Sequence, residues 1–249
     1  MNLRGAIVAR AELSACDLDA MYALMVRHYD GVERGKFLAD LAEKDGALLL
    51  RGDDGSIRGF SSYRLLAGTA PTGGYRALFS GDTIVDARAW GSMVTLRTLG
   101  TLFGRLLAVP GDPLYWLLLS KGIRTYLLLP LMFRRFCPGG GPSGGSIEHS
   151  VLEHLARERF GAAFCAATSV VRPAAPADRL KPEWARVSPA RLADPDVRFF
   201  MSRNPGHVVG DELVSIARIA HDNLTDAGQR LVRPPADALA PPFTAGGAG

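Results

Sequence analysis

Two apolar segments of this 249-residue chain end in polar side chains that could carry out chemistry. The segment 79–91, FSGDTIVDARAWG, holds the carboxylate Asp82 inside an apolar run, where a charge is costly unless it has a partner or a function. The second segment is 114–126, LYWLLLSKGIRTY. Its polar residues are Ser120, Lys121, Arg124 and Tyr126. Each segment has the pattern of a strand that turns into a helix, so together they predict a pocket at two neighbouring strand ends.

Histidine is the side chain best suited to proton transfer near neutral pH, and His28 ends the first predicted helix, in MVRHYDG. An ammonium group must lose a proton before its nitrogen can attack, and an imidazole oriented by a carboxylate can accept that proton. We therefore predict that His28 and Asp82 act as an acid–base pair. The alternative is structural: the helix dipole favours His28 at a helix end, and Asp82 caps a turn.

A second polar motif, NPGHVVGDE, occupies residues 204–212 and contains His207. Asn-Pro-Gly is a strong turn signal, and a histidine with two carboxylates between apolar segments could form a polar site. His207 is thus an alternative base or a contact for an acceptor substrate. The alternative is a hairpin whose side chains bond their own backbone. We predict no metal here, because a second His or Cys is missing at ligand spacing.

Hydrophobic periodicity and turn signals indicate the elements that must position these residues. The predicted strands are 5–12, 47–51, 57–66, 75–85 and 114–119. The predicted helices are 18–29, 33–43, 90–108 and 123–136. After them we expect a helix at 147–160, strands at 163–171, 197–201 and 212–219, and loops at 69–74 and 173–189.

This order of elements resembles the GNAT acyltransferase superfamily over roughly residues 5–136, with later strands within 163–219. The resemblance implies an α/β (α+β) fold with a GNAT-like mixed central sheet flanked by helices. It also implies an acyl thioester bound between two splayed central strands, here 75–85 and 114–119. The expected parts are a core at 1–137, a Gly-rich connection at 138–145, a part at 146–232 that completes the fold or forms a lid, and a disordered tail at 233–249.

The resemblance also implies which residues contact the donor. In the superfamily, a Gly- and Arg-rich turn before a helix binds the pyrophosphate of coenzyme A through backbone N–H groups. The equivalent turn, 86–92, keeps one Arg and one Gly, which favours the single phosphate of acyl-phosphopantetheine on an acyl carrier protein over acyl-CoA. The implied donor contacts are Ser80, Thr83, Val85, Arg88, Trp90, Gly91, Ser92, Ser120, Lys121 and Arg124.

The implied activity is transfer of an acyl group from acyl-CoA or an acyl carrier protein to an amine of a peptide or small amino compound. His28 or His207 would deprotonate the amine, backbone N–H groups beside Asp82 would polarise the thioester, and Tyr126 would protonate the thiolate. The His28–Asp82 pair is similar to that of toxin-activating lysine acyltransferases, which use acyl carrier protein. Helices rich in Leu and Phe favour a fatty acyl group. No permanently bound cofactor is expected.

The composition of the chain argues against several other classes of protein. The 29 Lys and Arg residues are scattered and exceed the 25 Asp and Glu residues by only four, which disfavours nucleic-acid binding. Three widely spaced cysteines favour a reducing, cytoplasmic location. Charges interrupt the longest apolar stretch, 114–133, so no membrane span is expected. Two alternatives remain, a non-catalytic module that binds an acyl carrier or lipid and an acyl-homoserine-lactone-type signal synthase.

Overall fold

The computed structural model describes residues 2–139, 145–174 and 177–233. Most of the predicted Gly-rich connection and all but the first residue of the predicted tail lie outside these ranges. The strands are β1 Leu3–Ala9, β2 Tyr29–Asp30, β3 Gly46–Gly52, β4 Ile57–Ala70, β5 Gly73–Val85, β6 Leu114–Ser120, β7 Phe164–Cys165, β8 Val170–Val171, β9 Arg179–Leu180 and β10 Glu212–Arg218. The helices are α1 Ala15–His28, α2 Arg34–Ala42, α3 Val94–Leu107, α4 Ile123–Tyr126, α5 Leu128–Met132, α6 Ser146–Phe160, α7 Pro182–Ala185, α8 Pro195–Arg203 and α9 Asp226–Leu231.

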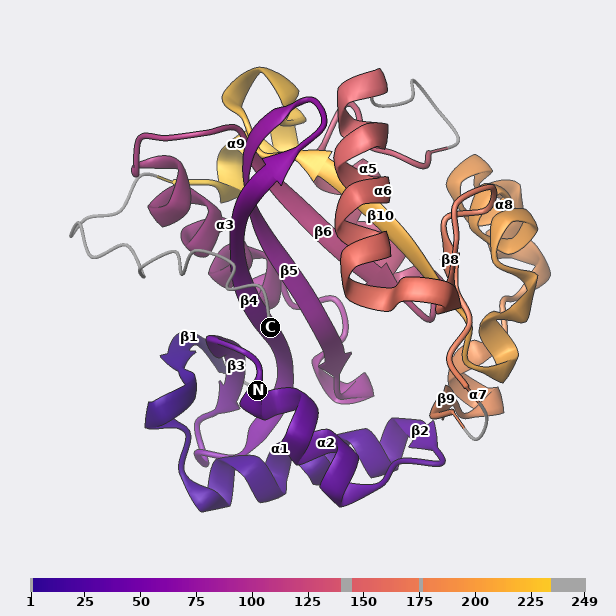
Figure 1. Cartoon of the computed structure of the whole chain (residues 1–249). Coiled ribbons are helices and arrows are strands. Elements are labelled where there is room, and N and C mark those ends of the chain that lie inside the picture. Colours follow the sequence, from indigo (N-terminus) through magenta and orange to yellow (C-terminus); the bar gives the residue numbers. More distant parts are fainter. Residues whose placement is uncertain (1, 140–144, 175–176, 234–249) are drawn as a thin grey trace.

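Eight strands form one mixed sheet in the order β1-β3-β4-β5-β6-β10-β8-β7. Its pairs are antiparallel except for β5 and β6, which run parallel because α3 connects them. Figure 1 shows α6 crossing one face of β6 and β10, while α1 and α2 lie along the lower edge. The predicted mixed α/β class, with a central sheet flanked by helices, is confirmed. The region after residue 145 contributes β7, β8 and β10 to the same sheet.

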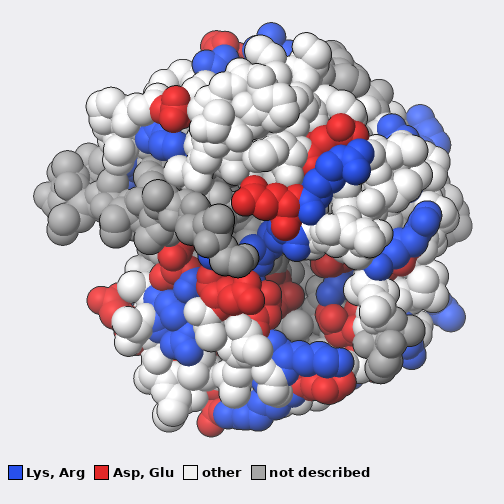
Figure 2. Space-filling model, viewed as in Figure 1, with Lys and Arg blue, Asp and Glu red and all other residues white. Residues whose placement is uncertain are grey.

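Lys and Arg alternate with Asp and Glu over the face seen in Figure 2, so the basic residues form no single stripe there. This agrees with the scatter of charges along the sequence. Within the described ranges, no helix is both long enough and apolar enough to cross a membrane.

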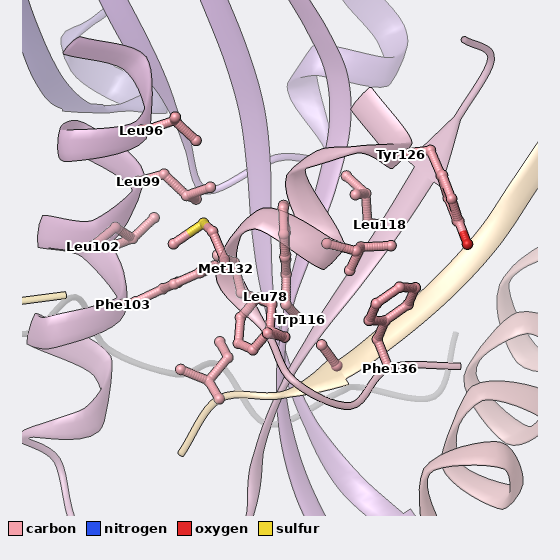
Figure 3. Close-up of a cluster of buried hydrophobic side chains, with 14 of the residues drawn as sticks. Leu78, Leu96, Leu99, Leu102, Phe103, Trp116, Leu118, Tyr126, Met132 and Phe136 are labelled. Atoms are coloured by element: carbon pink, nitrogen blue, oxygen red, sulfur yellow. The ribbon is translucent and has the colours of Figure 1, made fainter. Parts of the chain in front are cut away.

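The largest buried side chains form a core between the sheet and α3, α4 and α5 (Figure 3). Trp116 of β6 lies at its centre, with its ring centroid 5.3 Å from that of Phe103 on α3. The Trp116 indole N–H donates to Ser80 Oγ over 2.9 Å, so this buried donor is satisfied. Most of the Leu and Phe residues of these helices are buried in the core.

The predicted helix at 123–136 is wrong in its second half. The helical segment is divided into α4 and α5, and it ends at Met132. Pro130 accounts for the division, because a proline ring conflicts with the carbonyl four residues earlier, which here belongs to Tyr126. Beyond Met132 the chain is extended, and Cys137 forms a β-bridge with Ile216 of β10.

Other predictions differ from the structure. The described part of the predicted loop at 173–189 contains β9 and α7. Residues 197–201 form part of helix α8 rather than a strand, because Asp194 caps it by accepting from the Asp196 N–H over 2.9 Å and Pro195 opens it. The predicted strand at 163–171 is a short hairpin of β7 and β8. Four of the six residues of the predicted loop at 69–74 belong to the ends of β4 and β5, and only residues 71 and 72 form the turn.

The central strands splay apart at the point where β5 carries a bulge. β5 pairs with β6 only from Arg76 to Ser80, and beyond that point it pairs only with β4. Opposite Ser62 of β4, two residues of β5 occupy the place of one, namely Gly81 and Asp82. A bulge interrupts the alternation of side chains, so Asp82 lies on the same side as Phe79, where both line one cavity.

Candidate functional site

Two cavities open beside the splayed ends of β5 and β6. One, of about 240 Å³, lies among the end of β5, the start of α3, α4 and the end of α1; we call it the aromatic cavity. The other, of about 540 Å³, lies among β5, α2, α6 and the start of β10; we call it the charged cavity. Thr83 lines the aromatic cavity and its neighbour Asp82 lines the charged one, so adjacent residues of one strand serve both.

A row of side chains in contact with one another lines the aromatic cavity. The Arg124 guanidinium lies 3.5 Å from the centroid of the Trp90 ring. The rings of Trp90 and Trp184 are 5.2 Å apart, and Trp184 is 5.2 Å from the imidazole of His28. The indole N–H of Trp184 and Nε2 of His28 are buried and have no hydrogen-bond partner in the described part of the chain. Two unsatisfied polar atoms beside one cavity suit a ligand with hydrogen-bonding groups.

The start of α3 also borders the aromatic cavity, through Ser92 and Thr95. Gly91 has φ of +83°, a conformation that favours glycine, and the chain turns there into the helix. Ser92 Oγ accepts from the Val94 N–H over 3.2 Å. The other N–H groups of the first turn lack partners within the helix, so they can bind an anion.

Asp86 holds the turn before α3 in place. It is buried, and it accepts hydrogen bonds from Arg88 at 3.0 Å and from Arg27 at 2.6 Å. The hydrogen bond from Arg88 is the main reason that the pKa of Asp86 lies at about 2. Arg88 is therefore engaged in fixing the turn rather than extended into the aromatic cavity.

Three carboxylates share one ammonium group at one end of the charged cavity. Lys121, whose side chain is 12% exposed, pairs with Asp178 and lies 3.7 Å from Glu212 Oε1. Burial alone would lower the pKa of Lys121, but Glu212, Asp178 and Asp82 together raise it above its usual value. Lys121 Nζ also lies 5.5 Å from the ring centroid of Tyr29. This end carries excess negative charge when all three carboxylates are ionised.

Asp82 is the member of this group without a direct partner. Within the described ranges, it forms no hydrogen bond or ion pair, although it is half-buried. Burial raises the pKa of Asp82 to about 6, and Lys121 opposes this rise without cancelling it. A carboxylate with a pKa near 6 can accept a proton at neutral pH and can attract a cation.

The structure brings six of the predicted donor contacts together around the aromatic cavity and separates the other four. The six are Thr83, Val85, Trp90, Gly91, Ser92 and Arg124. Ser80 accepts the hydrogen bond from Trp116 in the core, and Ser120 is fully buried. Lys121 belongs to the charged cavity, and Arg88 binds Asp86.

The four predicted catalytic residues lie in four different places. His28 is in the aromatic cavity and Asp82 in the charged one. His28 Nδ1 lies 3.0 Å from the Leu24 carbonyl oxygen, so Nε2 is the atom left without a partner. Tyr126 is fully buried in the core, with its hydroxyl 3.4 Å from the Pro138 carbonyl oxygen.

His207 lies in the 3₁₀ turn η5, Pro205–Val209, which replaces the predicted hairpin turn. Its Nδ1 is 3.1 Å from the Asn204 carbonyl oxygen, and its ring packs 5.7 Å from that of Phe200. It is buried among these groups, apart from the residues that line the two cavities.

Sequence reasoning missed several residues of the two cavities. They are Tyr29, Lys44, Arg159, Asp178 and Trp184. Trp184 comes from the Pro- and Ala-rich segment that was predicted as a loop, and a tryptophan within such a segment was the one available signal. Glu212 stood in the motif 204–212, but nothing in the sequence connected it with Lys121. In the parts of the chain that the structure describes, no cluster of side chains suits a metal ion.

Comparisons with known proteins give structural similarity only. No protein-family model matches the chain, and no curated protein matches it. Three similar solved structures are a conserved protein of unknown function from Enterococcus faecalis, a GNAT family N-acetyltransferase from Escherichia coli in complex with CoA, and glucosamine-6-phosphate N-acetyltransferase from Arabidopsis thaliana.

The similarity to these three structures is low and partial. Their sequence identities are 9%, 16% and 12%, and their TM-scores are 0.41, 0.36 and 0.37. The matched regions cover 55%, 49% and 51% of this chain. They cover 33%, 65% and 88% of the other chains, so this chain spans a third of the first and just under two thirds of the second.

Proposed function

We propose that this protein is an N-acyltransferase that moves an acyl group from a thioester to an amine. The donor would occupy the aromatic cavity and the acceptor the charged cavity, and they would meet where β5 and β6 part. The observation that carries this proposal is Asp82, an unpaired carboxylate with a raised pKa at the bulge between the two cavities. A charge in that position costs stability, and it is explained if a cationic amine binds there.

In the proposed reaction, Asp82 takes a proton from the bound ammonium group, and the freed nitrogen attacks the thioester carbon. The new C–N bond forms, the C–S bond breaks, and the departing thiolate needs a proton. The amide nitrogen loses its second proton in the same sequence, and that proton replaces the one given to the thiolate. Tyr29 is our candidate for that step, because it lines the aromatic cavity and its ring lies beside Lys121. Burial raises the pKa of Tyr29, so the phenol stays protonated until the thiolate forms. Tyr126 is too enclosed by the core for this role.

The free edge of β5 supplies the donor contacts in this proposal. Beyond Ser80 the strand has no pairing with β6, so the backbone of residues 81–84 has no strand partner on that side. The Val85 carbonyl is already occupied, since it accepts from the Trp90 indole N–H over 2.9 Å. An acyl-pantetheine arm contains two amides and could pair with this edge as an added strand does. A backbone N–H beside Asp82 would then polarise the thioester carbonyl.

The donor class is a finer part of the proposal. The first turn of α3 suits one phosphate, and Arg88 is occupied by Asp86, which favours acyl-phosphopantetheine on an acyl carrier protein over acyl-CoA. A fatty acyl group is favoured by the apolar lining of the aromatic cavity. The residues concerned are Ile84, Leu96, Ile123, Leu128 and Leu180. A cytoplasmic location, with its reducing conditions and acyl carriers, fits the same proposal.

Thioester turnover followed by intact mass tests the proposal. The protein would be mixed with acyl-CoA and acyl-carrier-protein donors of several chain lengths and a pool of amines, in parallel with Asp82→Asn and His28→Ala. We expect amine-dependent loss of the acyl group from one donor class, abolished by Asp82→Asn. Donor binding without turnover would instead support a non-catalytic binding module, and release of a lactone would support a signal synthase.

A further inference from the structure

The charged cavity is also lined by a second charged group with few partners, Arg159 of α6. Its side chain is 18% exposed, and its guanidinium carbon lies 4.2 Å from the centroid of the Phe79 ring. Its ion pair with the exposed Glu43 is long, at 3.8 Å. In the described part of the chain, the guanidinium forms no hydrogen bond, although it has five N–H donors.

The cavity thus holds two charges of opposite sign that do not satisfy each other. Asp82 lies at the anionic end, near Lys121 and its carboxylates, and Arg159 lies at the end marked by Phe79. Other cations of the cavity are neutralised within the protein, since Lys44 pairs with Asp40 over 2.5 Å. Figure 2 shows acidic and basic side chains side by side around the hollow between α6 above and α2 below.

Arg159 reaches the cavity beside Phe79 of β5, whereas Asp82 lies further along the same strand. Phe79 and Asp82 are three residues apart, which corresponds to roughly 10 Å of strand. The bulge at Gly81 places both on the same cavity. A Cβ atom on residue 81 would lie 2.7 Å from Ser62 Oγ and 3.0 Å from Lys44 Cε, so glycine is needed for this packing. A ligand that reaches both ends therefore needs its charges several bonds apart.

We propose that the acceptor is an amino compound that also carries a carboxylate several bonds from the reacting amine. Its ammonium group binds at Asp82 and its carboxylate at Arg159. A guanidinium fork matches a carboxylate in geometry and charge. This inference rests on the proposed acyl transfer, and it narrows the acceptor class to amino acids that react through a distal amine, or to peptides with a nearby carboxylate.

The test compares matched acceptors with the donor found active in the turnover experiment. The acceptors are 6-aminohexanoate, hexylamine, which lacks the carboxylate, and glycine, in which the two groups are close. We expect kcat/KM for 6-aminohexanoate to exceed that for hexylamine and for glycine by roughly 10- to 100-fold. Equal values for 6-aminohexanoate and hexylamine would overturn the proposal, and so would a preference for glycine.

Variants of Arg159 test whether its guanidinium is the group that binds the acceptor carboxylate. Arg159→Gln should raise KM for 6-aminohexanoate by roughly 10- to 100-fold and leave the kinetics of hexylamine unchanged. Arg159→Lys keeps the charge but loses the guanidinium fork. Its KM for 6-aminohexanoate should lie between those of the wild-type protein and Arg159→Gln. If Arg159→Gln changes both acceptors equally, or neither, the assignment of Arg159 is wrong. Thermal unfolding of each variant separates these effects from a loss of folded protein.

Failure of this inference can be told apart from failure of the proposed function. Calorimetric titration of the wild-type protein with 6-aminohexanoate and with hexylamine needs no turnover. If no donor is consumed but 6-aminohexanoate binds more tightly than hexylamine, the acyl-transfer proposal fails while the ligand class stands. If donors are consumed and both amines behave alike, acyl transfer stands and the carboxylate inference fails.

Discussion

The two cavities beside β5 and β6 differ most in the charge of their linings and in their volume. The aromatic cavity is lined by indole, imidazole and aliphatic groups, and its one guanidinium is stacked on Trp90. The charged cavity adds carboxylates, ammonium groups and the Arg159 guanidinium to an otherwise apolar lining, and it is about twice as large. Both receive residues from the same strand end, Asp82 on one side and Thr83 on the other.

This contrast teaches how one strand end can serve two kinds of substrate. An acyl thioester is long and largely apolar, and it gains from apolar burial and a few hydrogen bonds. An amine is an ammonium ion in water, and it must be attracted by negative charge and then lose its proton. If the proposed function is right, changes in one cavity should affect one substrate and leave the other alone.

Asp82→Asn should have the largest effect, because it removes the proposed base. We expect kcat to fall roughly 10²- to 10⁴-fold, while the donor dissociation constant stays within twofold of wild type. Steady-state kinetics and donor titration measure the two quantities. Asp53→Asn, in the exposed turn between β3 and β4, is the matched control and should behave as wild type. Loss of donor binding in Asp82→Asn would mean that the two cavities are not separate in function.

Trp184→Ala changes the aromatic cavity, so it should weaken binding of the donor and leave binding of the acceptor unchanged. Removal of an anchoring aromatic ring commonly costs about 2 kcal/mol of binding, or roughly 30-fold in affinity. We expect the donor KM to rise by that order and the acceptor KM to stay constant. Trp184→Phe keeps a ring against His28 and should lose much less. A rise in acceptor KM of the same size would contradict the assignment of the aromatic cavity to the donor.

The pH dependence of the reaction should report Asp82. With saturating acceptor, the rate should fall about tenfold per pH unit on the acid side of an inflection at or below pH 6, because protonated Asp82 cannot accept a proton. The charged or titratable groups that face Asp82 are Tyr29, Asp40, Lys121, Asp178 and Glu212. If the residual activity of Asp82→Asn keeps the same acid limb, another group controls it.

The smallest effect concerns stability. Burial raises the pKa of Asp82 from 3.8 to about 6, so the folded protein binds this proton more tightly than the unfolded chain does. The free energy of unfolding therefore decreases as pH rises from about 4 to 6 and stays lower above. Asp82→Asn removes that cost, and it should stabilise the protein by about 1–2 kcal/mol at pH 8 but little at pH 4. Denaturant unfolding at both pH values measures the difference. A destabilised variant at pH 8 would mean that Asp82 has a partner in solution.

Much of the fold could be predicted because its signals are local. The runs that became β3, β5 and β6 are apolar, and Ser14 caps α1 by accepting from the Asp17 N–H. Most of the errors fell on short elements after residue 123, where a proline divides a helix and Asp194 starts α8 within a segment that looked like a strand. The predicted loop at 69–74 is the earlier exception, because β4 and β5 extend into it.

The candidate site was predictable in part for the same reason. Six of the predicted donor contacts surround the aromatic cavity because five of them lie within one strand–turn–helix segment, Thr83–Ser92. The pairing of His28 with Asp82 was an expectation about long-range packing, and the structure places the two residues in different cavities. Lys121 was expected beside the donor, but its side chain points to the carboxylates of distant segments.

The sequence by itself determined that Asp82 is exceptional, because a carboxylate in an apolar strand needs an explanation wherever the strand lies. It also determined the strand–turn–helix that borders the aromatic cavity, through local periodicity and turn residues. Only the tertiary structure decided which side Asp82 faces, since the bulge opposite Ser62 arises from pairing with β4. It also decided that Lys121, Asp178 and Arg159 meet around one cavity, because contacts between distant segments depend on packing that no local pattern encodes.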